Sequence, residues 1–216
     1  MVGGTGLFID SFIDHIQFAH VQTNPDLRRE LLAKDGTELY RTLQQVDPTA
    51  AAEIHPNNKN RVVRALELYY AGITKTAQNA ASRREDSPYE ALYFVLHYRD
   101  RQVLYDRINA RVDAMLAAGL VEEARQAYAA CGPTARQAIG HKELLPYLEG
   151  SEPLETAVER LKQETRRYAK RQITWFKRRQ GTVVLEPDTM DTERLIAAAT
   201  AQTEDFLYGK DKGKRA

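Results

Sequence analysis

The segment from Leu154 to Arg179 constrains the fold most, because its periodicity predicts one long amphipathic helix. Its later part is strongly basic: nine lysines and arginines but a single acid, Glu164, lie between Arg160 and Arg179. The chain of 216 residues has a net charge of only +1, so the net charge of the whole chain does not reveal this local excess of basic residues. The sequence therefore predicts a long helix with a locally basic surface.

Most other segments also predict helices, delimited by capping residues and by glycine or proline stops such as Gly36. The expected helices begin near Gly6 and cover residues 25–36, 37–44, 48–54, 59–71, 100–119, 120–131, 134–150 and 192–208. Residues 92–97 and 183–185 predict short strands, 74–89 a loop, and 209–216 a disordered basic tail. The chain is thus expected to be mostly α-helical with a few short strands.

Two of these helices have recognisable apolar faces, and both faces are expected to be buried. The first face consists of Val62, Leu66, Tyr69 and Tyr70, and the second of Leu104, Ile108, Val112, Met115 and Leu116. Cys131 ends a further apolar pattern and is expected to be a small core residue. As the only cysteine, it excludes a disulfide within the chain and a zinc site built from paired cysteines.

Composition indicates an ordinary globular protein, with 43% hydrophobic and 28% charged residues. The length suits one sizeable domain, or a core with a smaller inserted lobe. No apolar run approaches the roughly 20 residues needed to cross a membrane. A cytoplasmic location without a membrane partner is therefore expected.

A glycine-rich turn, Gly3-Gly4-Thr5-Gly6, precedes the first helix. Backbone N–H groups at such a helix start can approach an oxygen anion closely, and the Thr5 side chain adds a hydroxyl. A tight structural turn explains the same residues, so both interpretations stay open. Because this kind of turn normally follows a strand, and only Met1 and Val2 precede it, we expect the chain to begin inside a larger fold.

Two arginine pairs have spacings that place both members on one side of a helix. Arg61 and Arg64 are three residues apart, in a position to contact phosphates. Arg107 and Arg111 are four residues apart and repel each other unless an anion lies near them. The acids that offer a purely structural alternative are Glu67 for the first pair, and Asp106 and Asp113 for the second.

Within the long basic helix, aromatic and basic side chains are interleaved. One stripe contains Tyr168, Gln172, Trp175 and Arg179, and another contains Lys170, Thr174 and Lys177. Basic side chains with aromatics between them suit a nucleic-acid backbone and unstacked bases. The alternatives are a membrane-surface helix, a solvated face, or a core role for Tyr168, Trp175 and Phe176.

Six segments of the chain follow one another in a characteristic order: VGGTGLF, NPDLRREL, LQQVDPTAAAEIHPNNKNRVVRALELYYAGI, RINARVDAMLAAGLVEEA, RQAIGHKEL and TRRYAKRQITWF. In sequence and order these segments resemble the tRNA dimethylallyltransferase family. The resemblance runs from Val2 to about Leu185. The third and the last of these segments are long and specific.

The resemblance implies an α/β fold, in which a P-loop NTPase-like parallel sheet core carries an inserted helical lobe. Residues 1–19 and 86–208 would be the remainder of that core, and residues 20–85 approximately the tRNA-binding lobe. The implied activity transfers a dimethylallyl group from its diphosphate to N6 of adenine 37, a base flipped out of the anticodon loop. The implied partners are the tRNA anticodon stem-loop and dimethylallyl diphosphate, with Mg²⁺ as cofactor and a monomeric enzyme.

Residue roles follow from the same resemblance. Thr5 matches a threonine near the flipped adenine, and Arg111 matches an arginine that helps to bind the donor diphosphate. The residues implied to contact tRNA are Arg28, Asn60, Arg61, Arg64, Gln137, Gly140, His141, Lys142, Lys170, Arg171, Gln172, Thr174, Trp175 and Lys177.

The sequence also departs from the family pattern. It has no GPTxSGKS-type loop, which cradles the diphosphate, and no SxDSxQxY segment, whose aspartate the family uses as general base. No turnover by this chain alone is therefore expected, and the loop that would hold Mg²⁺ is absent. Phe8, Asn58 and His141 stand where tyrosine, aspartate and tyrosine are usual.

Two other functions stay open. One is a non-catalytic RNA-binding module that retains the tRNA-contacting surface without the chemistry. The other is an adenylate isopentenyltransferase, which acts on free nucleotides. The basic helix and the inserted lobe argue against the latter, because a free nucleotide needs no surface that grips an anticodon stem-loop.

Overall fold

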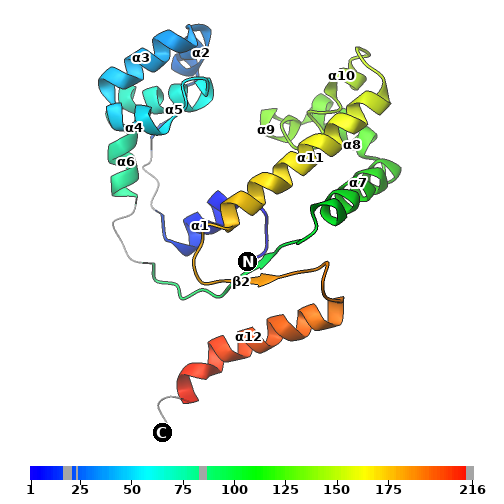
Figure 1. Cartoon of the computed structure of the whole chain (residues 1–216). Coiled ribbons are helices and arrows are strands. Elements are labelled where there is room, and N and C mark those ends of the chain that lie inside the picture. The colour runs from blue at the N-terminus through cyan, green and yellow to red at the C-terminus, as the bar shows by residue number, and fades with distance from the viewer. Residues whose placement is uncertain (17–20, 23, 83–86, 213–216) are drawn as a thin grey trace. The chain divides into compact units, whose positions relative to one another are not determined.

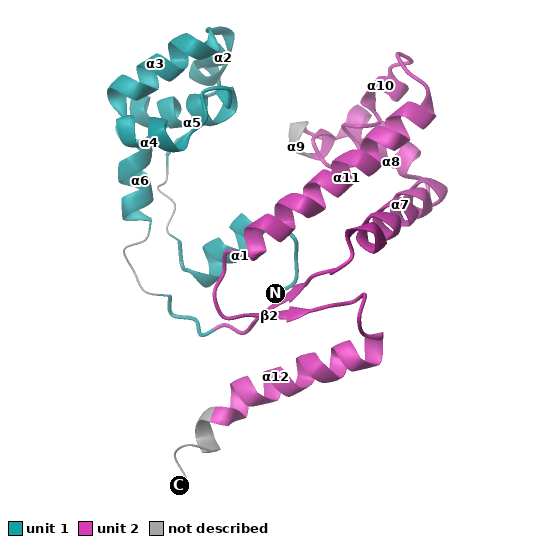
Figure 2. Ribbon diagram, viewed as in Figure 1, with its two compact units in different colours: residues 1–90 teal, residues 91–216 magenta. Residues whose placement is uncertain are grey.

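The computed structural model describes residues 1–16, 21–22, 24–82 and 87–212. The chain divides into two compact units, residues 1–90 and residues 91–216 (Figure 2). Each unit has its own buried cluster of apolar side chains.

The first unit is helical (Figure 1). Its helices are α1 (Gly6–Ile13), α2 (Pro25–Ala33), α3 (Gly36–Val46), α4 (Pro48–Glu53), α5 (Lys59–Tyr70) and α6 (Lys75–Ala81). Helix α5 is central, because it packs against α2, α3 and α6 and its residues 62, 63, 65, 66, 67 and 68 are buried. The core residues are Leu31, Leu39, Leu43, Ala51, Val62, Val63, Ala65 and Leu66.

Side-chain caps start most of these helices, because a carboxylate, amide or hydroxyl oxygen accepts the otherwise unpaired N–H groups of the first turn. The capping residues are Asn24, Asp35, Asp47, Asn58 and Thr74. Asp47 has a second role, since its Oδ2 accepts the Thr76 backbone N–H at 2.9 Å and so joins α4 to α6. Burial alone would raise the pKa of the Asp47 carboxyl, but hydrogen bonds from Thr76 and Ala50 outweigh it and lower this pKa.

Three predictions for this unit are wrong. Gly36 begins α3 instead of ending the preceding helix, because the Asp35 cap starts a new helix at that point. Within the predicted loop 74–89, residues 75–81 form α6, which the Thr74 hydroxyl caps; residues 83–86 lie outside the described part. Tyr69 and Tyr70 are exposed, since the buried face of α5 is turned toward Val62 and Leu66.

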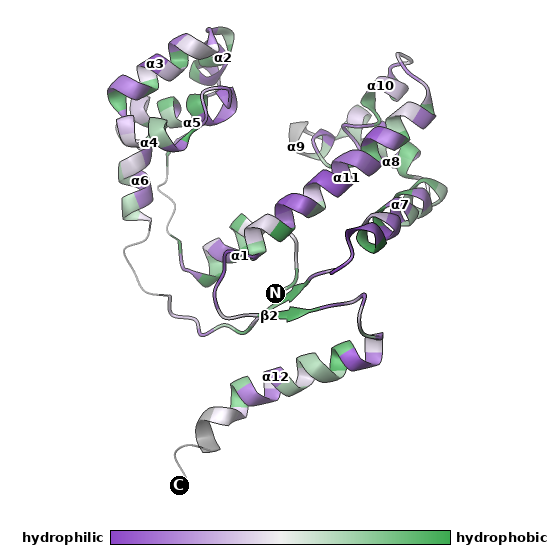
Figure 3. Cartoon of the chain, viewed as in Figure 1, coloured by the Kyte–Doolittle hydropathy of each residue, from purple (hydrophilic) through white to green (hydrophobic). Residues whose placement is uncertain are grey.

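The second unit combines helices with a small sheet. Its helices are α7 (Arg101–Ala117), α8 (Leu120–Ala130), α9 (Pro133–Arg136), α10 (Leu145–Leu148), α11 (Leu154–Phe176) and α12 (Thr192–Lys212). Strands β1 (Tyr93–Leu96) and β2 (Thr182–Leu185) pair in parallel, with Tyr93 opposite Thr182 and Leu96 opposite Leu185. Both strands are hydrophobic, whereas α11 carries long hydrophilic stretches (Figure 3).

The core of this unit lies among α7, α8, α10 and the first half of α11. Its buried residues are Val112, Leu120, Ala124, Leu144, Ala157 and Leu161. Among the described residues of the predicted apolar face of α7, only Val112 is fully buried. Met115 and Leu116 are partly buried and pack against this cluster. The first half of α11 is thus anchored in a core, and its basic second half extends beyond it.

Other boundaries in this unit also differ from the predictions. Helix α11 ends at Phe176, so Lys177 is its C-cap residue and Arg179 lies beyond the helix. Helix α12 continues to Lys212, so residues 209–212 of the expected disordered tail are helical, and 213–216 lie outside the described residues. Cys131 is exposed at the C-cap of α8, so the prediction that it is a small core residue is wrong.

The described part of the chain is mostly helical with a short parallel pair of strands, as expected for a piece of an α/β fold. The division into a core of residues 1–19 and 86–208 and a lobe of residues 20–85 stays a prediction. Within the described ranges, the search for a helix with the length and apolarity of a membrane span found none.

Candidate functional site

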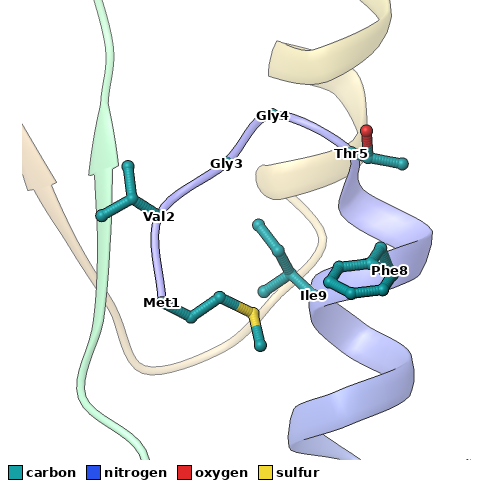
Figure 4. Close-up of a pocket in the computed structure, with 7 residues that line it drawn as sticks. All are labelled: Met1, Val2, Gly3, Gly4, Thr5, Phe8 and Ile9. Carbon is teal, nitrogen blue, oxygen red and sulfur yellow. The ribbon is translucent and has the colours of Figure 1, made fainter.

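The glycine turn of the first unit borders a cavity of about 220 Å³ (Figure 4). The Thr5 carbonyl accepts the N–H groups of Phe8 and Ile9 at 3.0 and 3.2 Å, which starts α1. The Thr5 side chain makes no capping hydrogen bond, so its hydroxyl is not used to start the helix. The lining consists of Met1, Val2, Gly3, Gly4, Thr5, Phe8 and Ile9. The turn thus provides a small, largely apolar hollow with one side-chain hydroxyl.

Two residues implied to contact tRNA, Arg28 and Arg64, both pair with the buried Glu67 of α5. Its Oε2 accepts Arg28 Nη1 at 2.9 Å and Arg64 Nη1 at 3.4 Å. The Glu67 side chain is 8% exposed, but each arginine side chain is 43% exposed. The structure therefore brings together two residues that the sequence placed 36 positions apart, and the Arg64–Glu67 pair weighed as an alternative is present.

Asn60 and Arg61 lie in the first turn of the same helix and are both exposed. The Asn58 side chain caps this turn by accepting the Arg61 N–H at 3.3 Å. Asn58, which replaces the aspartate usual at this position, thus retains the capping role through its amide oxygen. The first turn of α5 presents its polar side chains to solvent.

In the second unit, the turn at residues 137–142 is held by two carboxylates. Gly140 is buried with a φ of 104°, and its N–H donates to Glu143 Oε2 at 2.9 Å. The ring of His141 lies between two acceptors, with Nδ1 2.9 Å from the Ala135 carbonyl and Nε2 3.1 Å from Glu123 Oε1. Lys142 Nζ is 3.6 Å from Glu143 Oε1. Gln137 and Lys142 are exposed. The carboxylates of Glu143 and Glu123 therefore hold the turn, while these two polar side chains face solvent.

The basic half of α11 exposes Lys170, Arg171, Thr174 and Trp175, and Lys177 follows at its C-cap. The Arg171 guanidinium lies 5.6 Å from the ring centre of Tyr168, and the Thr174 hydroxyl donates to the Lys170 carbonyl at 2.9 Å. Gln172 is partly buried. Exposed cations beside an exposed indole give this surface the character of a nucleic-acid contact.

The aromatic residues of this helix differ in environment. Phe176 is partly buried and packs on Tyr93 of β1, with ring centres 6.1 Å apart. Trp175 instead keeps 37% of its surface exposed, so the core role holds for Phe176 better than for Trp175. A groove of about 390 Å³ lies where α11 ends against the sheet, lined by Val95, His97, Ile173, Phe176, Lys177, Arg179, Gly181, Thr182 and Val184.

On α7, the predicted arginine pair is not neutralised by its neighbouring acids. Asp113 instead pairs with Lys162 Nζ at 2.7 Å, and Asp106 accepts Gln102 Nε2 at 2.8 Å. Arg107 lies 5.9 Å from the ring centre of Tyr98. Arg111 is exposed, and no ion pair of Arg111 is found within the described ranges. Its guanidinium is therefore available to an anion.

Among the described residues, no group of three or more His, Cys, Asp or Glu side chains is placed to hold a metal ion. Mg²⁺ is commonly bound through one or two carboxylates together with substrate phosphates and water. The Mg²⁺ implied by the resemblance stays a prediction, and none of the chemistry below is assigned to it.

The structure also reveals polar residues that the sequence analysis did not select. Glu143 anchors the Gly140 turn. The pKa of Lys75 is lowered by burial and by the positive charge of Arg64, which outweigh the opposite effect of Glu53. Arg166 joins α11 to α7 through Asn109 Oδ1 at 2.7 Å. The sequence did contain a signal for Glu143, because this acid directly precedes the apolar Leu144 and Leu145. In the structure, Leu144 belongs to the core cluster that includes Leu120 and Ala124 of α8.

Comparison with known proteins gives a uniform result. A sequence profile described as IPP transferase matches residues 1–179. A tRNA dimethylallyltransferase from Exiguobacterium sibiricum is 49% identical over 183 residues, which are 82% of this chain and 57% of that protein. The chain thus spans little more than half the length of this curated relative.

Two solved structures are also similar. The full-length tRNA isopentenylpyrophosphate transferase from Bacillus halodurans superposes with a TM-score of 0.60 at 36% identity, covering 99% of this chain and 66% of that one. A eukaryotic dimethylallyltransferase acting on tRNA gives a TM-score of 0.71 at 29% identity, with 96% and 56% coverage. The similarity therefore extends over nearly the whole chain.

Proposed function

Because this chain belongs to the IPP transferase family, we propose that it forms part of a tRNA-modifying enzyme. The enzyme transfers a dimethylallyl group from dimethylallyl diphosphate to N6 of adenine 37, beside the anticodon. The observation that carries this proposal is the family match over residues 1–179, since that range contains every candidate site residue from Thr5 to Lys177.

In this proposal, the basic half of α11 holds the RNA. Lys170, Arg171 and Lys177 contact phosphates, which takes advantage of counterion release from the nucleic acid. The exposed ring of Trp175 offers a surface on which an unpaired base can stack. Gln172 and Thr174 provide hydrogen-bonding groups on the same helix segment. The exposed Asn60, Arg61, Gln137 and Lys142 give additional polar contacts, while Gly140 and His141 shape their turn.

Two further residues serve the transfer itself. Arg111 binds the donor diphosphate, because a guanidinium can make two parallel hydrogen bonds to phosphate oxygens. The Thr5 hydroxyl lies beside the target adenine and can hydrogen-bond to its edge. What supports these roles is the exposed, unneutralised guanidinium of Arg111 and the hydroxyl of Thr5, which takes no part in capping α1.

The test compares binding of the full chain to an anticodon stem-loop and to AMP across a range of salt concentrations. We expect the logarithm of the affinity for the stem-loop to fall linearly with the logarithm of the salt concentration, and we expect AMP to bind weakly. Arg171→Ala should lower the slope by about 0.7 to 0.9, the contribution of one phosphate contact. The matched control is Arg194→Ala, which removes an exposed arginine of α12 outside the matched range and should leave the slope unchanged. Equal affinity for AMP and the stem-loop would contradict the proposal.

A further inference from the structure

Glu123 lies in the first turn of α8, and its side chain reaches the turn formed by residues 137–142. Its Oε1 is 3.1 Å from Nε2 of His141, which lies 18 residues further along the chain. The Glu123 side chain is 68% exposed, whereas that of His141 is only 12% exposed. The resemblance implied a tRNA contact for His141, but its ring has little surface left for one. Glu123 is not among the residues implied to contact tRNA.

The ring of His141 is held on two sides. While Nε2 faces Glu123, Nδ1 lies 2.9 Å from the carbonyl oxygen of Ala135 in α9. Helices α8 and α9 pack against each other, so the two oxygens belong to one packed pair of helices (Figure 1). Because an imidazole is rigid and each of its nitrogens can take part in a hydrogen bond, the two contacts fix both the place and the orientation of the ring. His141 thereby ties the 137–142 turn to both helices.

Glu143 gives the same turn a second attachment. Its Oε2 accepts the Gly140 N–H at 2.9 Å, and its backbone carbonyl accepts Arg160 Nη1 at 3.4 Å. Arg160 belongs to α11, whose basic half carries the other proposed RNA contacts of this unit. The turn also lies close to the start of α8, since a Cβ added at Gly140 would be 3.4 Å from a Cδ of Leu120. The 137–142 turn is therefore held by α8, α9 and α11.

These attachments leave the polar side chains of Gln137 and Lys142 exposed on the turn. A loop that is already ordered loses less conformational freedom when it binds a ligand, and so binds it more tightly than the same loop when mobile. Glu123 can therefore strengthen RNA contacts made by Gln137 and Lys142 without touching the RNA.

We propose that Glu123 is a positioning residue for RNA binding, which acts through His141 to hold the 137–142 turn in its RNA-binding conformation. This inference rests on the proposed function for the identity of the ligand. It assigns to His141 the task of holding the turn, in place of direct contact with RNA. It also predicts that Glu123 increases RNA affinity in spite of its negative charge.

The principal test is Glu123→Ala in the full chain, with affinity for the anticodon stem-loop measured at about 0.15 M salt. We expect binding to weaken about threefold or more, because the RNA must then order a looser turn. Charge alone predicts the opposite direction, since an acid near a phosphate-binding surface repels the RNA. Binding by Glu123→Ala that is as tight as wild type, or tighter, would overturn the positioning role.

Two further variants separate the hydrogen bond from the charge. Glu123→Gln should bind within about twofold of wild type, because a side-chain amide can either accept from Nε2 or donate to it. The matched control is Glu122→Ala, which removes an exposed acid that pairs with Arg125 in the same turn of α8. It should bind the stem-loop as tightly as wild type or more tightly. Equal weakening by Glu123→Gln and Glu123→Ala would contradict positioning through a hydrogen bond.

Amide hydrogen exchange provides a readout that needs no RNA. Gly140, His141 and Lys142 each donate a backbone N–H to an oxygen within this region, so their exchange rates report on the order of the turn. These rates should rise in Glu123→Ala and stay at the wild-type values in Glu122→Ala. The urea midpoints of both variants should match the wild type, because both side chains are exposed. Unchanged exchange in Glu123→Ala would show that Glu123 does not hold the turn.

The outcomes distinguish this inference from the proposed function. Wild-type protein that does not bind the stem-loop refutes the proposed function, and with it any RNA-binding role of the turn. Wild-type protein that binds, together with Glu123→Ala that binds equally well, leaves the proposed function standing and overturns the role of Glu123.

Discussion

The backbone N–H of Gly140 donates to the buried carboxylate of Glu143 at 2.9 Å. Glu143 is only 3% exposed, and its own carbonyl accepts Arg160 Nη1 at 3.4 Å. This bond closes the turn that carries His141 and Lys142, in which Gly140 adopts a left-handed backbone conformation. A polar turn implied to contact RNA is therefore shaped by a residue that does not face solvent.

Replacement of Gly140 by alanine should destabilise the protein. A left-handed conformation costs an L-residue roughly 1–2 kcal/mol, and the added Cβ would lie 3.4 and 3.7 Å from the two Cδ atoms of Leu120. We expect a loss of about 1–2 kcal/mol in the free energy of unfolding, measured by equilibrium urea denaturation. Gly132→Ala, at a position with open space around its Cβ, should leave stability nearly unchanged. Equal losses for the two variants would argue against this account.

The Asp47 carboxylate should make stability depend on acid pH. Because its pKa in the folded protein lies below the unfolded value of about 3.9, its contribution is fully present above that value. This contribution is lost as the pH falls through the folded-state pKa. Urea midpoints measured from pH 6 to pH 2.5 should therefore fall less steeply in Asp47→Asn than in the wild type.

The control for this experiment is Asp205→Asn, which changes an exposed aspartate of α12. It should retain the wild-type dependence of the midpoint on pH. Identical pH profiles for wild type and Asp47→Asn would show that the link from α4 to α6 does not depend on the charge of Asp47.

The hydrogen bond from Arg166 to Asn109 should couple α11 to α7. The donor–acceptor distance is 2.7 Å and both side chains are partly buried. A double-mutant cycle with Asn109→Ala and Arg166→Ala should give a coupling energy of about 1 kcal/mol. The comparison cycle uses Asn109→Ala with Arg167→Ala, because Arg167 is exposed and pairs with Glu164 instead. Similar coupling in both cycles would rule out a specific contact.

Trp175 should report RNA binding directly, since it is the only tryptophan and 37% of its surface is exposed. Stacking of a base on the indole should quench its fluorescence when the stem-loop is added, but not when an equal concentration of AMP is added. Trp175→Leu should weaken stem-loop binding by about 1–3 kcal/mol, the usual value of one base stacked on an aromatic ring. Phe12→Leu, at an exposed aromatic residue of α1, serves as the comparison. Unchanged fluorescence at saturation would place the RNA elsewhere.

Much of the helical architecture was predictable from local sequence. Asn24 and Asp100 cap helices at the expected positions, and Gly119 and Gly72 adopt the left-handed conformation that ends a helix. The prediction of a loop over residues 74–89 failed because the segment is polar and shows no apolar stripe. The Thr74 hydroxyl nevertheless caps a helix there by accepting the Ala77 N–H. Prediction also failed for Tyr70, because periodicity alone does not say how far around a helix the core extends.

The candidate site was less predictable. Sequence similarity implied roles for Arg28 and Arg64, but it did not show that both share Glu67, which lies 39 residues from Arg28. Likewise, the sequence shows Asp113 close to Arg111 in the chain, but only the structure shows that Asp113 pairs with Lys162 of α11 instead. Such pairings depend on which apolar faces pack, because packing brings distant polar groups within hydrogen-bonding distance.

By itself, the sequence determined most of the helices, several of their caps, the two β-rich runs and the family. Each depends on residues that are close in the chain or on the order of short segments, so no tertiary information is needed. Only the tertiary structure decided which charges are neutralised and which stay exposed. Glu67, Asp47 and Glu143 are buried because separate helices pack around them. A buried charge without a partner is costly, so each of these carboxylates must have a partner that the packing brings within reach.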